Sequence, residues 1–192
     1  MKEFFTRNPI ILPVYAPTWL LAVGSGMLTP ILPLYATSFG ASYGLVGIVL
    51  GSRGLGTIIG DLPAGVLLRR VGQRRLMLIG LACIALCGLA MSTAQALWML
   101  VLYGLLEGIG SALWNISRHA YLTDAAPAGQ RGRAIATFGG IFRTGNLVGQ
   151  AVGGLLAAWL GMRAPFAVYA VIAVVTMLFP AFFGVDGAHH QA

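Results

Sequence analysis

Three charged side chains stand near the middle of long apolar segments of this sequence: Arg53, Glu107 and Arg143. In the hydrocarbon core of a bilayer such charges are costly unless they are paired or hydrated, so they are candidates for function. A carboxylate can carry a proton, and an arginine can bind an anionic group. For Glu107 two interpretations stay open, a proton carrier or a structural ion pair with Arg143. For the two arginines, binding of an anionic substrate competes with pairing to Glu107 or to backbone carbonyls.

The composition of the chain shows what surrounds these charges. Of its 192 residues, 58% are hydrophobic and only 9% are charged, and its mean hydropathy is +0.84. A soluble domain carries about 25% charged residues. The composition therefore excludes a soluble enzyme, a disordered tail and a coiled coil, and it predicts an all-α integral membrane protein. In such a protein the net charge of +7 sets topology, so we expect no nucleic-acid partner.

Six apolar segments are long enough to cross a bilayer, which takes about 20 residues. We expect a single six-helix bundle over residues 1–192, surrounded by membrane lipid, with spans at 10–39, 43–68, 76–93, 97–119, 134–160 and 165–184. With a cytoplasmic N-terminus, the outer face receives only Arg163. The cytoplasmic face then receives Lys2, Arg7, Arg69, Arg70, Arg74, Arg75, Arg118, Arg131 and Arg133. This bias predicts insertion into the cell (inner or cytoplasmic) membrane with both termini in the cytoplasm, and the same orientation for every copy.

The second and fifth segments share a pattern that indicates an internal repeat. The shared residues are Gly51, Gly56, Gly60, Gly65, Gly72 and Arg74, which recur 89 residues later as Gly140, Gly145, Gly149, Gly154, Gly161 and Arg163. Arg53 and Arg143 miss this spacing by one residue. Three helices are thus followed by three equivalent helices. Because each unit holds an odd number of spans, the two units have opposite orientations, which is a transporter architecture.

The turn after the second span carries a longer motif, Gly65-Val-Leu-Leu-Arg69-Arg70-Val-Gly72-Gln-Arg74-Arg75. It resembles the signature loop of the major facilitator superfamily, Gly-x-x-x-Asp-Arg-x-Gly-Arg-Arg. The match keeps Gly65, Arg70, Gly72, Arg74 and Arg75. It departs at Arg69, which replaces an Asp that the resemblance implies as part of a conformational latch. Asp61, two turns upstream, is the candidate substitute.

Other segments resemble the same family. Gly104-Leu-Leu-Glu107-Gly108 is similar to its Arg-x-x-Gln-Gly motif of helix four, with Gly104 and Glu107 in place of the Arg and the Gln. Gly145, Gly149 and Gly153 are similar to its antiporter signature of helix five, with Gln150 where Pro is common. The resemblance implies a secondary active transporter, closest to drug/proton antiporters, that moves a small organic molecule with a proton or other coupling ion. Because helices one and four line the cavity in this family, it also implies substrate contacts for Trp114, Asn115 and Tyr35.

Length sets this chain apart from that family, whose members have twelve helices in two halves. Six spans correspond to one half. We therefore expect a parallel homodimer with a C2 axis along the membrane normal, which rebuilds the full transporter. Two alternatives stay open, a fragment of a twelve-helix transporter and a non-transporting scaffold subunit. The sequence shows no Walker loop, no metal-spaced Cys/His cluster and no nucleophile elbow, so we expect no cofactor, no metal and no enzyme activity.

Overall fold

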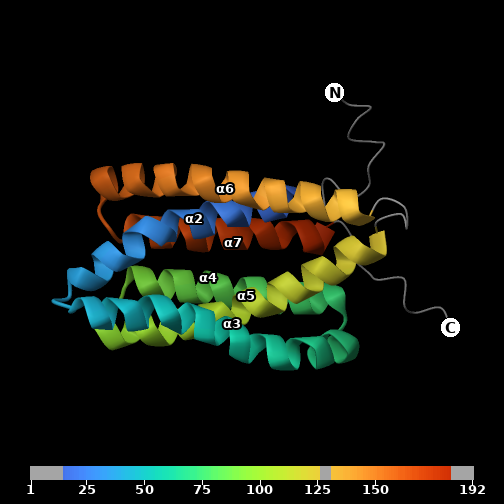
Figure 1. Cartoon of the computed structure of the whole chain (residues 1–192), viewed down its shortest axis with the longest axis horizontal. Coiled ribbons are helices and arrows are strands. Elements are labelled where there is room, and N and C mark those ends of the chain that lie inside the picture. Colours follow the sequence, from blue (N-terminus) through green and yellow to red (C-terminus); the bar gives the residue numbers. More distant parts are fainter. Residues whose placement is uncertain (1–14, 126–130, 183–192) are drawn as a thin grey trace.

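The computed structural model describes residues 15–125 and 131–182, and these residues form six helices and no strands. The helices are α2 (Ala16–Thr37), α3 (Tyr43–Val71), α4 (Gln73–Ser92), α5 (Leu97–Ala125), α6 (Arg131–Leu160) and α7 (Ala164–Phe182). They run side by side along the long dimension of the molecule, with α6 at one edge and α3 at the other (Figure 1). The all-α fold expected from the sequence is therefore confirmed.

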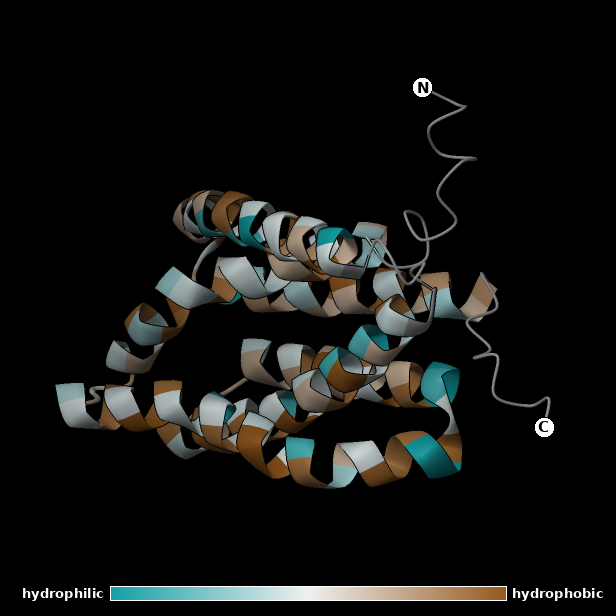
Figure 2. Cartoon of the chain, turned by 45° about the vertical axis from the view of Figure 1, so that its right-hand side comes forward, coloured by the Kyte–Doolittle hydropathy of each residue, from teal (hydrophilic) through white to brown (hydrophobic). Residues whose placement is uncertain are grey.

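Five of the six described helices are long and apolar enough to cross a membrane, and α6 is the exception. Its sequence carries Arg143, Asn146 and Gln150 among its apolar residues. Figure 2 shows hydrophobic residues along every helix, with hydrophilic residues at the turn between α3 and α4 and at several points along α6. The helix with the most polar sequence thus lies at an edge of the bundle, where its polar residues need not be buried in the core.

The helix ends differ from the expected spans where charged residues flank the apolar runs. Helix α4 begins at Gln73, α5 continues to Ala125 and α6 begins at Arg131, each beyond the hydrophobic segment that predicted it. Arginine, glutamine and alanine are good helix formers, so the helix continues although the hydropathy falls. Residues 10–14 of the expected first span and 183–184 of the sixth lie outside the described residues.

Single glycines make two of the turns between helices. Gly72 ends α3 with φ 85°, and Gly161 follows α6 with φ 89°. These positive φ values favour glycine, which lacks a Cβ. The Gly72 N–H donates to the Leu68 carbonyl at 3.0 Å, and the Gly161 N–H donates to Ala157 at 3.1 Å. The same kind of helix ending therefore occurs at Gly72 and Gly161, which correspond to each other in the repeat of 89 residues.

The packing of the bundle has α4 and α7 at its centre. Helix α5 packs against α3 and α4, α2 packs against α6 and α7, and α4 and α7 pack against each other. Glycines let α3 approach α5 closely, and likewise α6 approach α2. A Cβ built on Gly56 of α3 would collide with the backbone of α5, and one built on Gly108 of α5 would collide with the backbone of α3. A Cβ built on Gly149 or Gly153 of α6 would collide with the backbone of α2. Such small residues let helices approach closely in a membrane, where no hydrophobic effect drives them together.

Candidate substrate and ion-coupling site

Glu107 and Arg53 meet where α3 packs against α5. The Arg53 Nε lies 2.6 Å from Glu107 Oε2. The Glu107 side chain is only 1% exposed, whereas that of Arg53 is 35% exposed. Gly108 brings the two helices together at this level, because it lies against the carbonyl of Arg53. Each residue stands about ten residues from the N-terminal end of its helix, so both charges lie at the same level near the middle of the bundle.

The second carboxylate oxygen of Glu107 is held by two hydroxyl groups. The Tyr169 hydroxyl of α7 donates to Glu107 Oε1 at 2.6 Å, and Ser111 Oγ donates to the same oxygen at 3.0 Å. Tyr169 is itself 1% exposed. The carboxylate therefore binds groups from α3, α5 and α7. Hydrogen bonds to an ionised acceptor are short and strong, and all three partners here are donors that suit the ionised carboxylate. Protonation of Glu107 would remove the negative charge that holds Arg53.

Arg143 does not take part in this network. It is exposed on α6 and forms no ion pair with the described residues. The interpretation of Glu107 as a partner of Arg143 is therefore wrong, because Arg53 occupies that place. The one-residue departure of Arg143 from the repeat spacing gives the reason. One residue turns a side chain by about 100° around a helix, so Arg143 leaves the face that Gly145 and Gly149 present to α2.

Arg118 is a buried cation that sequence reasoning placed among the cytoplasmic charges. It is only 4% exposed. Its Nη2 donates to Asn115 Oδ1 at 2.8 Å, and its Nη1 lies 3.5 Å from the Thr18 hydroxyl. Its guanidinium also lies 4.4 Å from the centre of the Phe138 ring, which is a cation–π contact. Among the carboxylates whose side chains the structure describes, none pairs with it. The spacing of Asn115 and Arg118, three apart on one helix, is the signal that could have indicated this pair.

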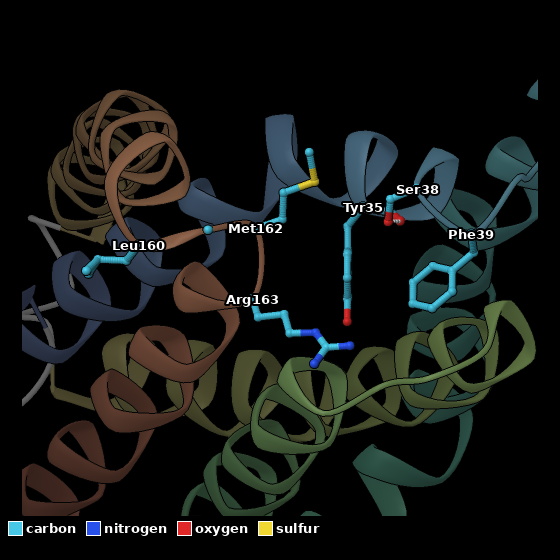
Figure 3. Close-up of a pocket in the computed structure, with 7 residues that line it drawn as sticks. Tyr35, Ser38, Phe39, Leu160, Met162 and Arg163 are labelled. Atoms are coloured by element: carbon cyan, nitrogen blue, oxygen red, sulfur yellow. Dashed lines mark hydrogen bonds between the residues drawn. The ribbon is translucent and has the colours of Figure 1, made fainter.

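The other residues expected to contact substrate lie in two places, beside Arg118 and at the far end of α2. Trp114 is buried and Asn115 is half-buried on α5, next to Arg118. Tyr35 lies at the far end of α2, where its hydroxyl donates to the Ala94 carbonyl at 3.1 Å. Arg163 donates to the same carbonyl at 3.3 Å. In Figure 3 the Tyr35 hydroxyl and the Arg163 guanidinium point toward one another beside a pocket of about 430 Å³. The expected residues thus form separate groups rather than one site.

The signature loop is built around Gly72 and Arg74. Arg74 Nη2 donates to the carbonyl of Ala181 at 2.7 Å, near the C-terminal end of α7. Gly65, Arg70 and Arg75 are exposed. Asp61 is exposed too, and within the described part of the chain it forms no ion pair. The role of Asp61 as a substitute for the missing loop carboxylate therefore has no contact that supports it.

Comparisons with known proteins agree with this all-helical bundle. The chain is 28% identical over 179 residues to the tetracycline resistance protein, class H, of Pasteurella multocida, covering 90% of this chain and 44% of that protein. It is 29% identical over 155 residues to the inner membrane transport protein YajR of Escherichia coli, covering 80% and 34%. The solved structure of the proton:xylose symporter XylE matches with a TM-score of 0.78 at 20% identity, covering 90% of this chain and 44% of that one.

The chain spans less than half the length of these relatives. A family model described as Major Facilitator Superfamily matches residues 17–191. Because that match covers nearly the whole chain, the protein belongs to the major facilitator superfamily.

Proposed function

We propose that this chain forms half of a secondary active transporter that moves small organic molecules by alternating access and is coupled to protons. The buried Glu107, bound to Arg53, Tyr169 and Ser111, is the observation that carries this proposal. A carboxylate that joins three helices near the middle of the bundle can change its charge and its contacts together. Release of Arg53 on protonation then links proton uptake to the packing of α3 against α5.

The architecture of the proposed transporter is an inverted repeat of three plus three helices. Helix contacts support it, because the close approach of α3 in the first unit to α5 in the second recurs with the units exchanged, as the approach of α6 to α2. The matching contacts are Gly56–Leu105 with Gly145–Trp19, and Gly60–Ile109 with Gly149–Val23. In both cases the glycine shifts by 89 residues toward the C-terminus and its partner by 86 residues toward the N-terminus, as an exchange of the two units requires. The two units are then related by an axis in the membrane plane, as in transporters whose site lies where the units meet.

The proposed assembly is a parallel homodimer with a C2 axis along the membrane normal. Alternating access needs two bundles that rock against each other, and the relatives are more than twice as long as this chain. A second copy with the same orientation supplies the missing bundle. The proposed orientation has both termini in the cytoplasm, and the arginines of the α3–α4 turn support it. A longer chain that carries both halves is the competing arrangement.

The proposed substrates are drug-like organic molecules, which the names of relatives suggest. Besides the tetracycline resistance protein, the chain matches the quinolone resistance protein NorA of Staphylococcus aureus at 22% identity. The proposed contacts are Trp114 and Asn115 beside Arg118, with Tyr35 near the outer end of α2. For Arg143 the interpretation as an anion-binding group stays open, because its exposed position on α6 leaves the guanidinium accessible.

Proteoliposomes with an imposed pH gradient test the proposed function, with tetracycline, a quinolone and xylose as probes. We expect gradient-driven flux of at least one probe. In Glu107→Gln we expect accumulation against a gradient to be lost while exchange of the probe across the membrane persists. Ser111→Ala is the matched control, because it removes one donor to Glu107 and keeps the carboxylate. Absence of flux for every probe would favour a scaffold subunit, and coupled flux in Glu107→Gln would exclude Glu107 as the proton carrier.

A further inference from the structure

A pocket of about 430 Å³ lies at the end of the bundle where α2 ends and α6 turns into α7 (Figure 3). One wall is the end of α2, with Tyr35, Ser38 and Phe39, and the other is formed by residues 160–163. Ser38 and all of residues 160–163 are exposed, so the pocket is accessible from the surroundings of the protein. We call it the outer pocket, because this end lies at the outer surface in the proposed orientation.

Arg163 gives the outer pocket its charge. Its Nη2 donates to the Ala94 carbonyl at 3.3 Å. Within the described part of the chain, Arg163 forms this one hydrogen bond and no ion pair, although a guanidinium has five N–H donors. The turns that meet at this end, residues 38–42, 93–96 and 161–163, contain no Asp or Glu. These turns therefore offer Arg163 no carboxylate, and most of its donors are available to an anion from outside the chain.

The rim of the outer pocket is apolar. Leu160 is 71% exposed, and Trp159 before it in the sequence is 83% exposed. Met162, on the other side of Gly161, is an exposed apolar side chain as well. In membrane proteins, tryptophans near the ends of the spans lie at the level of the lipid headgroups. An available arginine beside exposed apolar residues at this level matches an amphiphile better than a small hydrophilic ion.

We propose that the outer pocket binds a phospholipid, with its phosphate on Arg163 and the upper part of its acyl chains against Leu160 and Met162. A guanidinium binds a phosphate through two parallel N–H···O bonds. Helix α7 begins at Ala164, so its first N–H groups add positive potential beside the same anion. The inference goes beyond the proposed transport and uses only the membrane orientation from it.

Native mass spectrometry of the detergent-solubilised protein tests the site, with phosphatidylglycerol as the added probe. We expect one tightly bound lipid per chain. In Arg163→Gln its binding should weaken at least about tenfold, because charge-assisted hydrogen bonds are lost. The matched control is Arg75→Gln, which removes the same charge from an exposed arginine at the opposite end of the bundle. Equal weakening in the two variants would overturn the site, since it would show a general attraction between charges.

Ser38→Trp tests the pocket itself, because it fills the space and keeps Arg163. The Ser38 hydroxyl donates to the Tyr35 carbonyl three residues earlier at 2.7 Å, and the side chain is exposed, so we expect the variant to fold. Binding of phosphatidylglycerol should weaken as much as in Arg163→Gln. Unchanged binding would place the lipid elsewhere and overturn the proposal, whatever happens to the stability of Arg163→Gln.

Two further probes separate the sources of the phosphate. Glycerol 3-phosphate carries the phosphate without acyl chains, and diacylglycerol carries the chains without the phosphate. Each should bind at least about tenfold more weakly than phosphatidylglycerol, since each lacks one of the two contacts. Equal binding of glycerol 3-phosphate would show a site for a soluble anion, and equal binding of diacylglycerol would show an apolar contact alone. Either result would overturn the assignment to a phospholipid.

Discussion

Replacement of Arg53 by methionine isolates the electrostatic part of the central network. Methionine keeps an unbranched apolar stem of similar reach and removes the guanidinium. Glu107 then loses the 2.6 Å contact to Arg53 Nε and keeps the hydroxyls of Tyr169 and Ser111. The change leaves a carboxylate that is 1% exposed without its cation. Such a buried, uncompensated charge destabilises a protein more than the absence of the whole pair does.

The expected magnitude follows from the burial of the two partners. Removing one member of a fully buried pair costs about 3–5 kcal/mol. The Arg53 side chain is 35% exposed, so part of its interaction is screened and we expect about 2–3 kcal/mol. Glu107→Gln keeps the shape of the side chain and can still accept from Tyr169, so we expect about 1–2 kcal/mol. The double variant should be more stable than Arg53→Met alone, because no buried charge remains.

The assay is a double-mutant cycle. The free energy of unfolding of each protein is measured in detergent micelles by denaturant or thermal melting. The four proteins are the parent, Arg53→Met, Glu107→Gln and the double variant. Because the double variant should be more stable than Arg53→Met, the coupling energy must exceed the cost of Glu107→Gln, and we expect about 2–3 kcal/mol. Additive effects with no coupling would refute the reasoning, since they would mean that the ion pair contributes nothing in the folded bundle. A double variant less stable than Arg53→Met would refute the electrostatic explanation as well.

Two further predictions concern the buried cation and the two glycine faces of α6. Arg118→Met should raise the stability by about 1 kcal/mol, because it removes a buried charge that has no ion pair among the side chains the structure describes. The exposed Arg75→Met is the control and should change the melting temperature little. A loss of stability in Arg118→Met would contradict the argument. Gly149→Leu should cost about 3 kcal/mol, because its side chain would meet the Val23 carbonyl. Gly154→Leu should leave the melting temperature nearly unchanged, because a Cβ built on Gly154 meets no atom within 4 Å, and equal melting temperatures for the two variants would contradict the assignment of the two faces.

The sequence predicts that Arg53 and Glu107 lie at the same level along their helices, but it does not predict that they face each other. Both residues lie about ten residues from the outer end of a predicted span, and the axial level of a residue follows from its number along the helix. Rotation around the axis is different, because it depends on which face packs against a neighbour. Arg143 is a candidate partner of Glu107 by its position along the helix alone. In the structure α6 packs on α2 with another face, so Arg143 points outward.

The positions of two other site residues, Arg118 and Tyr169, depend on tertiary packing that the sequence does not show. Arg118 stands one residue before the end of its predicted apolar segment, which is typical of a solvated cation. In the structure α5 continues to Ala125, and Asn115 and Phe138 cover the guanidinium. Tyr169 gave no signal, since a tyrosine in an apolar helix is usually packed or at an interface. Only the approach of α7 to α4 and α5 assigns its hydroxyl to Glu107.

Helix α3 carries both Arg53 of the central network and the exposed Asp61. Arg53 and Asp61 are eight residues apart, which places them about 80° apart around the helix and about 12 Å apart along it. One side of α3 therefore holds Glu107, and an adjacent, exposed side carries Asp61. Within the bundle, reciprocal contacts join the central helices, because Arg74 donates to the end of α7 and Arg163 donates near the end of α4. In the proposed transporter, a bundle joined in this way moves as a unit. Protonation of Glu107 would there release Arg53 of α3, so the proposed change in charge and the proposed movement of the bundle share a single helix.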